Sequence, residues 1–373
     1  MIRALASLLA MALASGAALA QGVSESQIVL GQSVALTGPA QELGKDMQVG
    51  ASLYFNQVNA RGGVNGRRIV LKTLDDGYEP PRAVENTKKL INDERVFALF
   101  GYVGTPTSAA VLPIFTEARV PYVGAFTGAE LLRSPFNRYI FNVRASYFDE
   151  TEAIVQHLTA MSVNKIAVFY QNDAYGLAGL TGVERALARR NLQVAAKGTV
   201  ERNTVEVSKA VAEMSKANAQ AIVMISAYKS CAAFIKEMKK AGSNPTFWNV
   251  SFVGSKALAK ELDREGRGIQ ISQVVPFPWD SSIPVVKEYR ALLDAAKGEP
   301  GFGTLEGFIA AKVMVEGLRR AGKNLTRDSF IKAMESLDPY DAGGFKVSYG
   351  PDNHNGSKFV DLTIISRDQK FVR

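Results

Sequence analysis

The sequence "VFALFGYVGTPTSAA" (residues 96–110) joins a short apolar run to the start of a helix through two glycines. Its first five residues are apolar, as in a strand that is covered on both faces of a parallel sheet. Pro106 suits the first position of a helix, and Thr105 before it is expected to be the N-cap. A strand that leads through a glycine turn into a helix is typical of doubly wound α/β folds.

The same alternation of short apolar runs and amphipathic stretches continues in both directions. The predicted strands are residues 28–34, 69–74, 96–100, 121–124, 166–170, 194–199, 221–225 and 247–250. The predicted helices are residues 45–59, 81–92, 176–190, 205–216, 229–241 and 305–318, with a further helix from residue 106. The pattern predicts an α/β protein with two doubly wound parallel-sheet lobes.

The length of 373 residues allows two domains with separate cores. Crossings between lobes are expected at residues 142–147, 273–279 and 343–347, because each follows one α/β run and precedes another. The predicted first lobe comprises residues 21–143 and 276–344, and the second lobe comprises residues 144–275 and 345–373. Several crossings make a hinge, and such a hinge lets lobes close around a ligand.

The first 20 residues have the features of a secretory signal peptide. Arg3 precedes an apolar run at residues 4–14, and the segment ends in Ala18-Leu19-Ala20. We expect cleavage after Ala20, because an A-x-A ending is typical of the cleavage site. The run is too short to span a bilayer, and no cysteine follows Ala20 to carry a lipid anchor. The mature chain is therefore predicted to be free in the periplasm.

Residue composition argues against several classes of function. Cys231 is the only cysteine, so no disulfide or cysteine-based metal cluster can form within the chain. The chain has two histidines, which is few for a histidine-rich metal site or a catalytic triad. Neither a G-x-S-x-G nor an H-E-x-x-H motif occurs. The net charge of +8 is spread along the chain and forms no basic stripe for nucleic acid. We predict that the protein is not an enzyme and binds no cofactor, metal or nucleic acid.

Candidate ligand-binding residues follow the predicted strands, because ligands of open parallel sheets bind beyond the carboxyl ends of the strands. The helix start at Thr105 offers free backbone N–H groups that favour a carboxylate. Ala125 and Thr127 offer a carbonyl and a hydroxyl after the next strand. The alternative is that Thr105 and Thr127 only cap helices.

Two tyrosines of the second lobe are further candidates. Tyr175 and Tyr228 follow the strands at residues 166–170 and 221–225, so they could form a face that closes over a ligand. The alternative is that both are ordinary packing residues.

The order and spacing of several motifs resemble a known family over essentially all of the mature chain. They are "GQSVALTGPAQELGKD", "NARGGVNGRRI", "LDDGYEPPRAVENTKKLI", "FGYVGTPTSAA", "FTGAELL", "AVFYQNDAYG", "SFVGSKALA", "QVVPFP" and "LEGFIAAKVMVEGLRRAG". The chain resembles type I periplasmic binding proteins of the branched-chain amino-acid (Leu/Ile/Val-binding) ABC transporter family.

The resemblance implies roles for the candidate residues. Thr105 would hold a ligand carboxylate, Ala125 and Thr127 would contact an amino group, and Tyr175 and Tyr228 would close over the ligand. It also implies that the protein works as a monomer with a permease in the inner membrane and its ATPase. The alternative is a soluble sensing subunit for a receptor kinase or chemoreceptor.

Two departures from the family concern the ligand ammonium. The resemblance implies an acid after the strand at residues 247–250 and another past the first crossing, where this chain has Ser251 and Tyr147. Asp149 or Glu306 could supply the missing charge, although Glu306 is better explained as a helix-dipole charge. The ligand is therefore a hydrophobic amino acid or an aromatic or aliphatic carboxylic acid.

Overall fold

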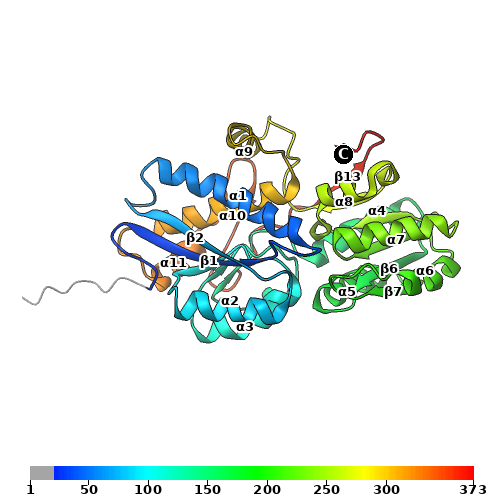
Figure 1. Ribbon diagram of the computed structural model, residues 1–373, viewed down its shortest axis with the longest axis horizontal. Coiled ribbons are helices and arrows are strands. Elements are labelled where there is room, and N and C mark those ends of the chain that lie inside the picture. The colour runs from blue at the N-terminus through cyan, green and yellow to red at the C-terminus, as the bar shows by residue number, and fades with distance from the viewer. Residues whose placement is uncertain (1–20) are drawn as a thin grey trace, which may run out of the picture.

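The computed structural model describes residues 21–373, so the predicted signal peptide lies outside the described residues. Figure 1 shows two lobes side by side, each built around its own sheet. The first sheet has the order β2-β1-β3-β4-β5 and the second has the order β14-β13-β10-β9-β8-β6-β7. The strands of the first sheet are Gln27–Val34 (β1), Arg68–Asp75 (β2), Ala98–Phe100 (β3), Tyr122–Val123 (β4) and Ile140–Phe141 (β5). Those of the second are Ile166–Gln171 (β6), Lys197–Val200 (β7), Ala221–Ile225 (β8), Thr246–Asn249 (β9), Gln270–Gln273 (β10), Asp361–Ile365 (β13) and Phe371–Val372 (β14).

Helices cover both sheets, as the predicted α/β class requires. The helices of the first lobe are Gln41–Ala60 (α1), Pro80–Asn92 (α2), Thr105–Glu117 (α3), Pro284–Ala295 (α9), Phe302–Ala321 (α10) and Arg327–Glu335 (α11). Those of the second are Tyr147–Ala160 (α4), Ala174–Ala188 (α5), Ser208–Met214 (α6), Tyr228–Lys240 (α7) and Ser255–Leu262 (α8). A short hairpin of Tyr340–Asp341 (β11) and Lys346–Val347 (β12) follows α11.

The pairing of the strands confirms the predicted parallel sheets. All strand pairs of the first sheet are parallel, and in the second sheet only the C-terminal strands β13 and β14 pair antiparallel. The predicted strand at 194–199 begins later, at Lys197, because the ladder with β6 starts there. The predicted helix at 205–216 is shorter, since α6 ends at Met214 and a 3₁₀ turn follows.

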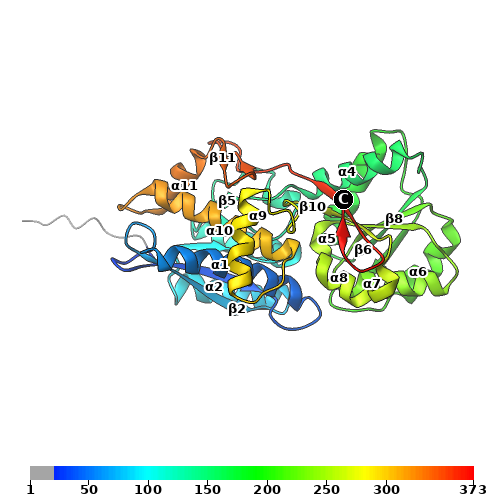
Figure 2. The same ribbon diagram turned by 90° about the horizontal axis from the view of Figure 1, so that it is seen from above.

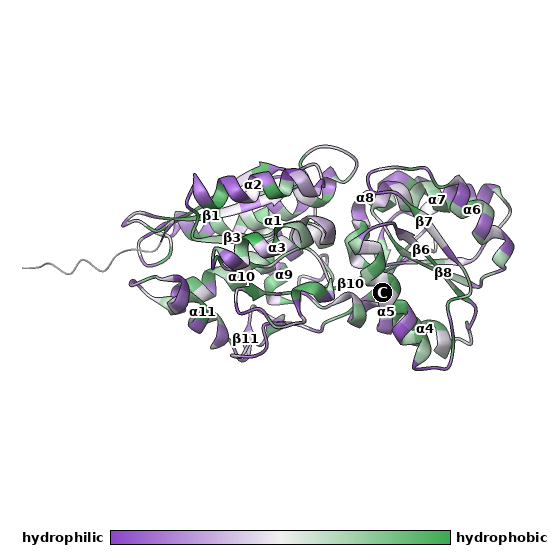
Figure 3. Ribbon diagram, turned by 90° about the horizontal axis from the view of Figure 1, so that it is seen from below, coloured by the Kyte–Doolittle hydropathy of each residue, from purple (hydrophilic) through white to green (hydrophobic). Residues whose placement is uncertain are grey.

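The apolar residues that identified the strands lie in the cores. Figure 3 shows β6 and β8 mainly in the hydrophobic colour, whereas α2 carries a largely hydrophilic surface. Cys231, the single cysteine, lies in the core of the second lobe. Among residues 21–373, no helix is both long and apolar enough to cross a membrane.

Helices α1 and α10 pack at unusually short range through glycines. A Cβ atom on Gly50 would lie 1.9 Å from the carbonyl oxygen of Thr304, and one on Gly307 would lie 2.5 Å from that of Met47. The backbones can approach this closely only because neither glycine has a side chain. The contact fixes α10, which comes late in the chain, against the beginning of the first lobe.

The chain passes between the sheets three times within the described residues: after β5, after β10 and before β13. Figure 2 shows the last passage, where the red C-terminal segment leaves the first lobe and joins the second. The first and last passages are hydrogen-bonded to each other, because the Asn142 N–H donates to His354 O (2.9 Å) and Asn142 O accepts from Gly356 N (2.8 Å). The residue boundaries given above for the lobes stay a prediction.

Gly50→Ala is expected to lower the free energy of unfolding by about 1–3 kcal/mol, because the added methyl group overpacks the α1–α10 contact. Helix propensity alone would favour alanine by about 1 kcal/mol. Urea unfolding checks the value. Val49→Ala, at the exposed neighbouring position, is the control and should change stability by less than about 0.5 kcal/mol. Equal or greater stability of Gly50→Ala would contradict this packing.

Candidate ligand-binding cleft

Aromatic rings from both lobes meet where the sheets face each other. The ring centroid of Phe252, just after β9, lies 6.0 Å from Tyr78 and 5.6 Å from Phe126, both of the first lobe. Tyr175, at the start of α5, lies 4.7 Å from Phe252 and 5.4 Å from Tyr147. All five side chains are buried. The lobes are therefore in contact across an aromatic cleft.

Hydroxyl groups cluster beside these rings. Thr105 Oγ1 and Thr127 Oγ1 are 2.7 Å apart, and Thr127 Oγ1 donates to the Tyr147 hydroxyl at 3.3 Å. The Tyr175 hydroxyl is fully buried and has no hydrogen-bond partner among residues 21–373. Burial raises the pKa of Tyr147 to about 12, although the Arg144 guanidinium opposes this shift. Burial also holds the pKa of Tyr175 well above its ordinary value. Both phenols are thus neutral donors near pH 7.

The prediction that Thr105 is the N-cap is wrong. The N-cap of α3 is Gly104, with φ of 103°, and Thr105 and Pro106 are the first two helical residues. Only glycine fits there, because a Cβ on Gly104 would lie 2.2 Å from the Tyr78 ring. Thr105 is therefore free of a capping role, and its hydroxyl points to Thr127 instead. The first-turn N–H groups of α3 have no preceding helical carbonyls to pair with.

The other predicted residues lie in different parts of the cleft. The carbonyl of Ala125 accepts a hydrogen bond from Thr127 N at 2.9 Å, so it helps to shape the turn. Tyr228, at the start of α7, lines another pocket between the lobes, with Glu42 of the first lobe and Lys256 of the second. Ser251 lies deeper, at the base of the cleft.

The base of the cleft holds a buried charged cluster that the sequence analysis missed. Arg144, 1% exposed at its side chain, donates to Glu150 at 2.7 Å and to Glu306 at 3.3 Å. It also donates to Ser251 Oγ. Glu150 further accepts from Ser251 N (2.8 Å), Ser251 Oγ (3.1 Å) and Ser272 Oγ (2.6 Å). Every acceptor position of Glu150 is thus used.

The charges in this cluster perturb one another. Burial alone would lower the pKa of Arg144, but Glu306 and Glu150 raise it above its ordinary value. Burial raises the pKa of Glu306 to about 7, and Arg144 only partly opposes this. The sequence-based interpretation of Glu306 as a helix-dipole charge is therefore wrong, because its carboxylate is an inward-facing partner of Arg144.

Asp149 does not supply a charge to the cleft. Its carboxylate accepts from the backbone N–H and the hydroxyl of Ser146, both at 2.9 Å, in the capping box of α4. Sequence reasoning could have recognised this pattern, since an acid three residues after a serine is an N-terminal signature of a helix.

Polar contacts join the lobes at the rim of the cleft. Arg202 of the second lobe pairs with Glu79 at 2.9 Å, and Gln171 Nε2 donates to the Tyr78 hydroxyl at 3.2 Å. Lys256 of α8 pairs with Glu299, which precedes α10. A small cavity between the lobes is lined from the first lobe by Leu43, Asp46, Phe126, Phe302, Gly303 and Glu306, and from the second lobe and its crossing by Ser251, Gly254, Ser255, Gln273, Val274 and Val275.

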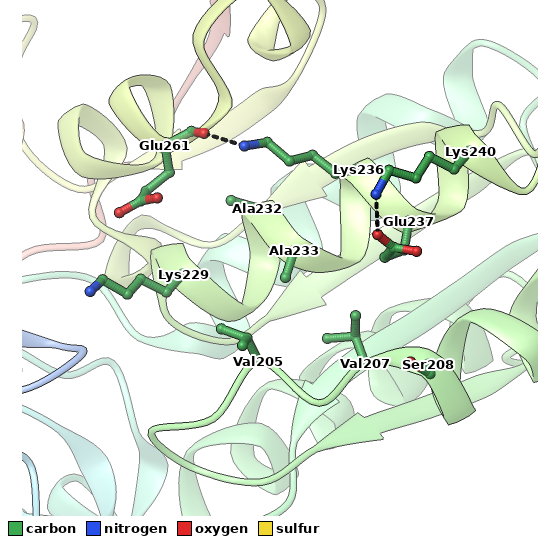
Figure 4. A pocket seen from close by; sticks show the side chains of 10 residues that line it. All are labelled: Val205, Val207, Ser208, Lys229, Ala232, Ala233, Lys236, Glu237, Lys240 and Glu261. Carbon is green, nitrogen blue, oxygen red and sulfur yellow. Dashed lines mark hydrogen bonds and ion pairs between the residues drawn. The ribbon is translucent and has the colours of Figure 1, made fainter.

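A separate hollow of about 480 Å³ lies on the second lobe, between α7 and the segment before α6 (Figure 4). Lys236 donates to the backbone carbonyl of Glu261 at 2.7 Å, and Lys240 pairs with Glu237 at 2.6 Å. The first bond fastens α7 to α8, and the second lies within α7. None of the predicted ligand-binding residues lines this hollow.

Comparison with known proteins identifies the family of this two-lobed chain. Residues 27–369 match the family model described as periplasmic binding protein. The chain belongs to this family. Its fold is the type I periplasmic binding protein fold.

Individual relatives of this binding protein are similar over nearly their whole length. The "Leu/Ile/Val-binding protein homolog 7" of Brucella abortus is 27% identical over 357 residues, which cover 91% of this chain and 87% of the relative. A structure described as "a possible leucine/isoleucine/valine-binding protein" from Rhodopirellula baltica is 35% identical, with a TM-score of 0.89 over 94% of this chain and 97% of that one. A substrate-binding periplasmic protein from Ralstonia solanacearum is 32% identical, with a TM-score of 0.87 over 93% and 99% of the two chains.

Glu150→Ala is expected to lower the free energy of unfolding of this binding protein by about 3–5 kcal/mol, because it leaves Arg144 buried with one partner fewer. Chemical denaturation measures the change. The matched control on α4 is Glu152→Ala, which removes partly exposed ion pairs to Arg189 and Arg190 and should cost less than about 1 kcal/mol. Similar losses of unfolding free energy for the two variants would show that the buried cluster contributes no more to stability than the exposed ion pairs.

Proposed function

We propose that the protein is the periplasmic substrate-binding component of an ABC importer that closes on a small, hydrophobic carboxylate. Support comes from the buried hydroxyl cluster of Thr105, Thr127, Tyr147 and Tyr175, which draws on both lobes at the start of α3. A closing cleft captures a ligand that binds the closed form better than the open form.

The hydroxyl cluster suits a carboxylate for two reasons. Neutral hydroxyls and helix N-terminal N–H groups both donate to an anion, and the helix dipole favours negative charge there. Tyr175 also brings a buried hydroxyl whose bonding capacity no residue of the described chain uses. Burying such a group costs free energy unless it gains a partner, and a ligand oxygen would provide one.

The rings of the cleft suit an apolar body on the ligand. Tyr78, Phe126 and Phe252 meet there and are buried, so a chain or ring of the ligand would exchange water for aromatic carbon. The names of several relatives refer to leucine, isoleucine and valine, whose side chains have this character.

The charges around the cleft favour a carboxylic acid without an amine. Ser251 stands where the family resemblance implies an acid, Asp149 caps α4, and Glu150 has no acceptor position left. Glu306 and Asp46 are the acids left in the cavity at the base, and Arg144 already contacts Glu306. Hydrophobic amino acids are the second candidate, and one of these two acids would then have to neutralise their ammonium group.

The mature chain begins after Ala20, acts as a monomer, performs no chemical reaction, and delivers its ligand to a permease in the inner membrane. The first lobe comprises residues 21–143 and 276–344, and the second comprises residues 144–275 and 345–373. Ala125 and Tyr228 shape the turn and the mouth of the binding site.

A thermal-shift screen of refolded mature protein tests the ligand class. The panel pairs leucine with 4-methylpentanoic acid and phenylalanine with 3-phenylpropanoic acid. A ligand at 100 times its Kd stabilises the protein by about 2.7 kcal/mol. We expect the acids without an amine to give the larger shift. Shifts by the amino acids alone would overturn the ligand class, and the absence of any shift across a wider set of acids would overturn the carboxylate site.

Tyr175→Phe is expected to weaken ligand binding by about tenfold or more, since a hydrogen bond to a charged group is worth about 1.5–3 kcal/mol. The stability of the ligand-free protein should not fall, because the hydroxyl has no partner in the chain. Calorimetric titration with the best acid of the screen measures the affinity. Tyr170→Phe, on β6 outside the cluster, is the control and should bind normally. Unchanged affinity of Tyr175→Phe would exclude the proposed contact.

A further inference from the structure

Phe252 carries the aromatic contact between the two lobes. Its ring centroid lies 6.0 Å from that of Tyr78 and 5.6 Å from that of Phe126, both of the first lobe. It also lies 4.7 Å from the ring centroid of Tyr175 in its own lobe, and the Phe252 side chain is fully buried. Because the Tyr175 hydroxyl belongs to the proposed carboxylate site, the apolar body of a ligand held there lies against the Phe252 ring or takes part of its place.

The backbone that carries Phe252 is held in place on both sides. Ser251, the preceding residue, donates to the Glu150 carboxylate from its N–H at 2.8 Å and from its hydroxyl at 3.1 Å. Gly254, two residues after the ring, has a φ of 81°, and a Cβ there would lie 2.7 Å from a methyl carbon of Leu43 in the first lobe. The size of the side chain at position 252 therefore decides how much room the cleft has on this side.

The facing rings of the first lobe are held by polar partners of their own. The Tyr78 hydroxyl accepts a hydrogen bond from Gln171 Nε2 at 3.2 Å, and the guanidinium of Arg144 lies 5.5 Å from the centre of the Phe126 ring. A change at either ring would leave such a partner without its contact. The Phe252 side chain is purely apolar, so it can be made smaller without leaving a polar group unpaired.

We propose that Phe252 is the specificity-determining residue that limits the length of the acid enclosed between the lobes. This inference rests on the proposed function, in which the hydroxyl cluster holds the carboxylate and the rings contact the apolar body. A smaller side chain at position 252 leaves space that further carbon atoms of the ligand fill, and each buried methylene strengthens binding about fourfold. In the wild type a longer acid has to displace the ring, and overpacking a filled core is unfavourable.

Straight-chain carboxylic acids from butanoic to decanoic acid test the proposal on the refolded mature protein. Calorimetric titration gives the affinity for each acid, and the length of the acid that binds most tightly is compared between the wild type and Phe252→Leu. The leucine side chain has about three carbon atoms fewer, so we expect the maximum to move to acids longer by about two or three carbons. These acids should bind the variant at least about tenfold more tightly than they bind the wild type.

The matched control is Phe247→Leu on β9, because Phe247 is also buried but its ring faces Phe234 in the core of the second lobe. Both leucine variants should lose thermal stability, whereas Phe252→Leu alone should move the maximum. Phe252→Met is the second variant if the leucine variant does not fold. Its unbranched side chain adapts to irregular gaps, so it too should bind longer acids than the wild type does.

An unmoved maximum in the variants of Phe252, or an equal shift in Phe247→Leu, would overturn the inference and leave the carboxylate site standing. A wild-type affinity that rises through the whole series, or a wild type that binds no straight-chain acid, would also contradict a length limit set by Phe252. The proposed function itself fails only if the acids of the thermal-shift screen do not bind either.

Discussion

The guanidinium of Arg144, buried between Glu150 and Glu306, is the interaction on which the arrangement of the lobes depends. Arg144 lies on the first passage between the lobes, Glu150 belongs to α4 of the second, and Glu306 belongs to α10 of the first. A buried charge without a partner costs several kcal/mol, so both helices must stay against this passage. The cluster also sets the base of the cleft, because the guanidinium lies 5.5 Å from the centre of the Phe126 ring and 5.8 Å from that of Tyr147.

The charged groups and the neutral polar groups of the cleft lie at two different depths. The charged groups at the base are largely satisfied within the chain, whereas the hydroxyls above them are neutral and one of them lacks a partner. In the proposed function, ligand recognition therefore falls to the hydroxyls, N–H groups and aromatic rings above the charged base. This division explains how one cleft can combine a preference for an anion with carboxyl groups at its base.

The fold could be predicted from sequence because its signals are local. Apolar runs such as the one at β8 gave the strand bounds directly, while β7 and α6 were misplaced because their ends depend on contacts with other elements. The position of Thr105 was predicted, but its capping role was wrong because the Tyr78 ring decides that Gly104 takes the cap. Arg144 could not be found, since its partner Glu306 is 162 residues away in the sequence and a single arginine carries no periodicity.

Enclosure of one hydrophobic carboxylate between the lobes is central to the function proposed for this periplasmic binding protein. Native mass spectrometry tests it most directly, with refolded protein incubated in a small-molecule extract of the cells that make it. The account predicts a one-to-one complex that releases a small acid with an apolar body when the protein is unfolded. Binding of a molecule without a carboxylate, or of none from extracts of cells grown on varied carbon sources, would contradict it.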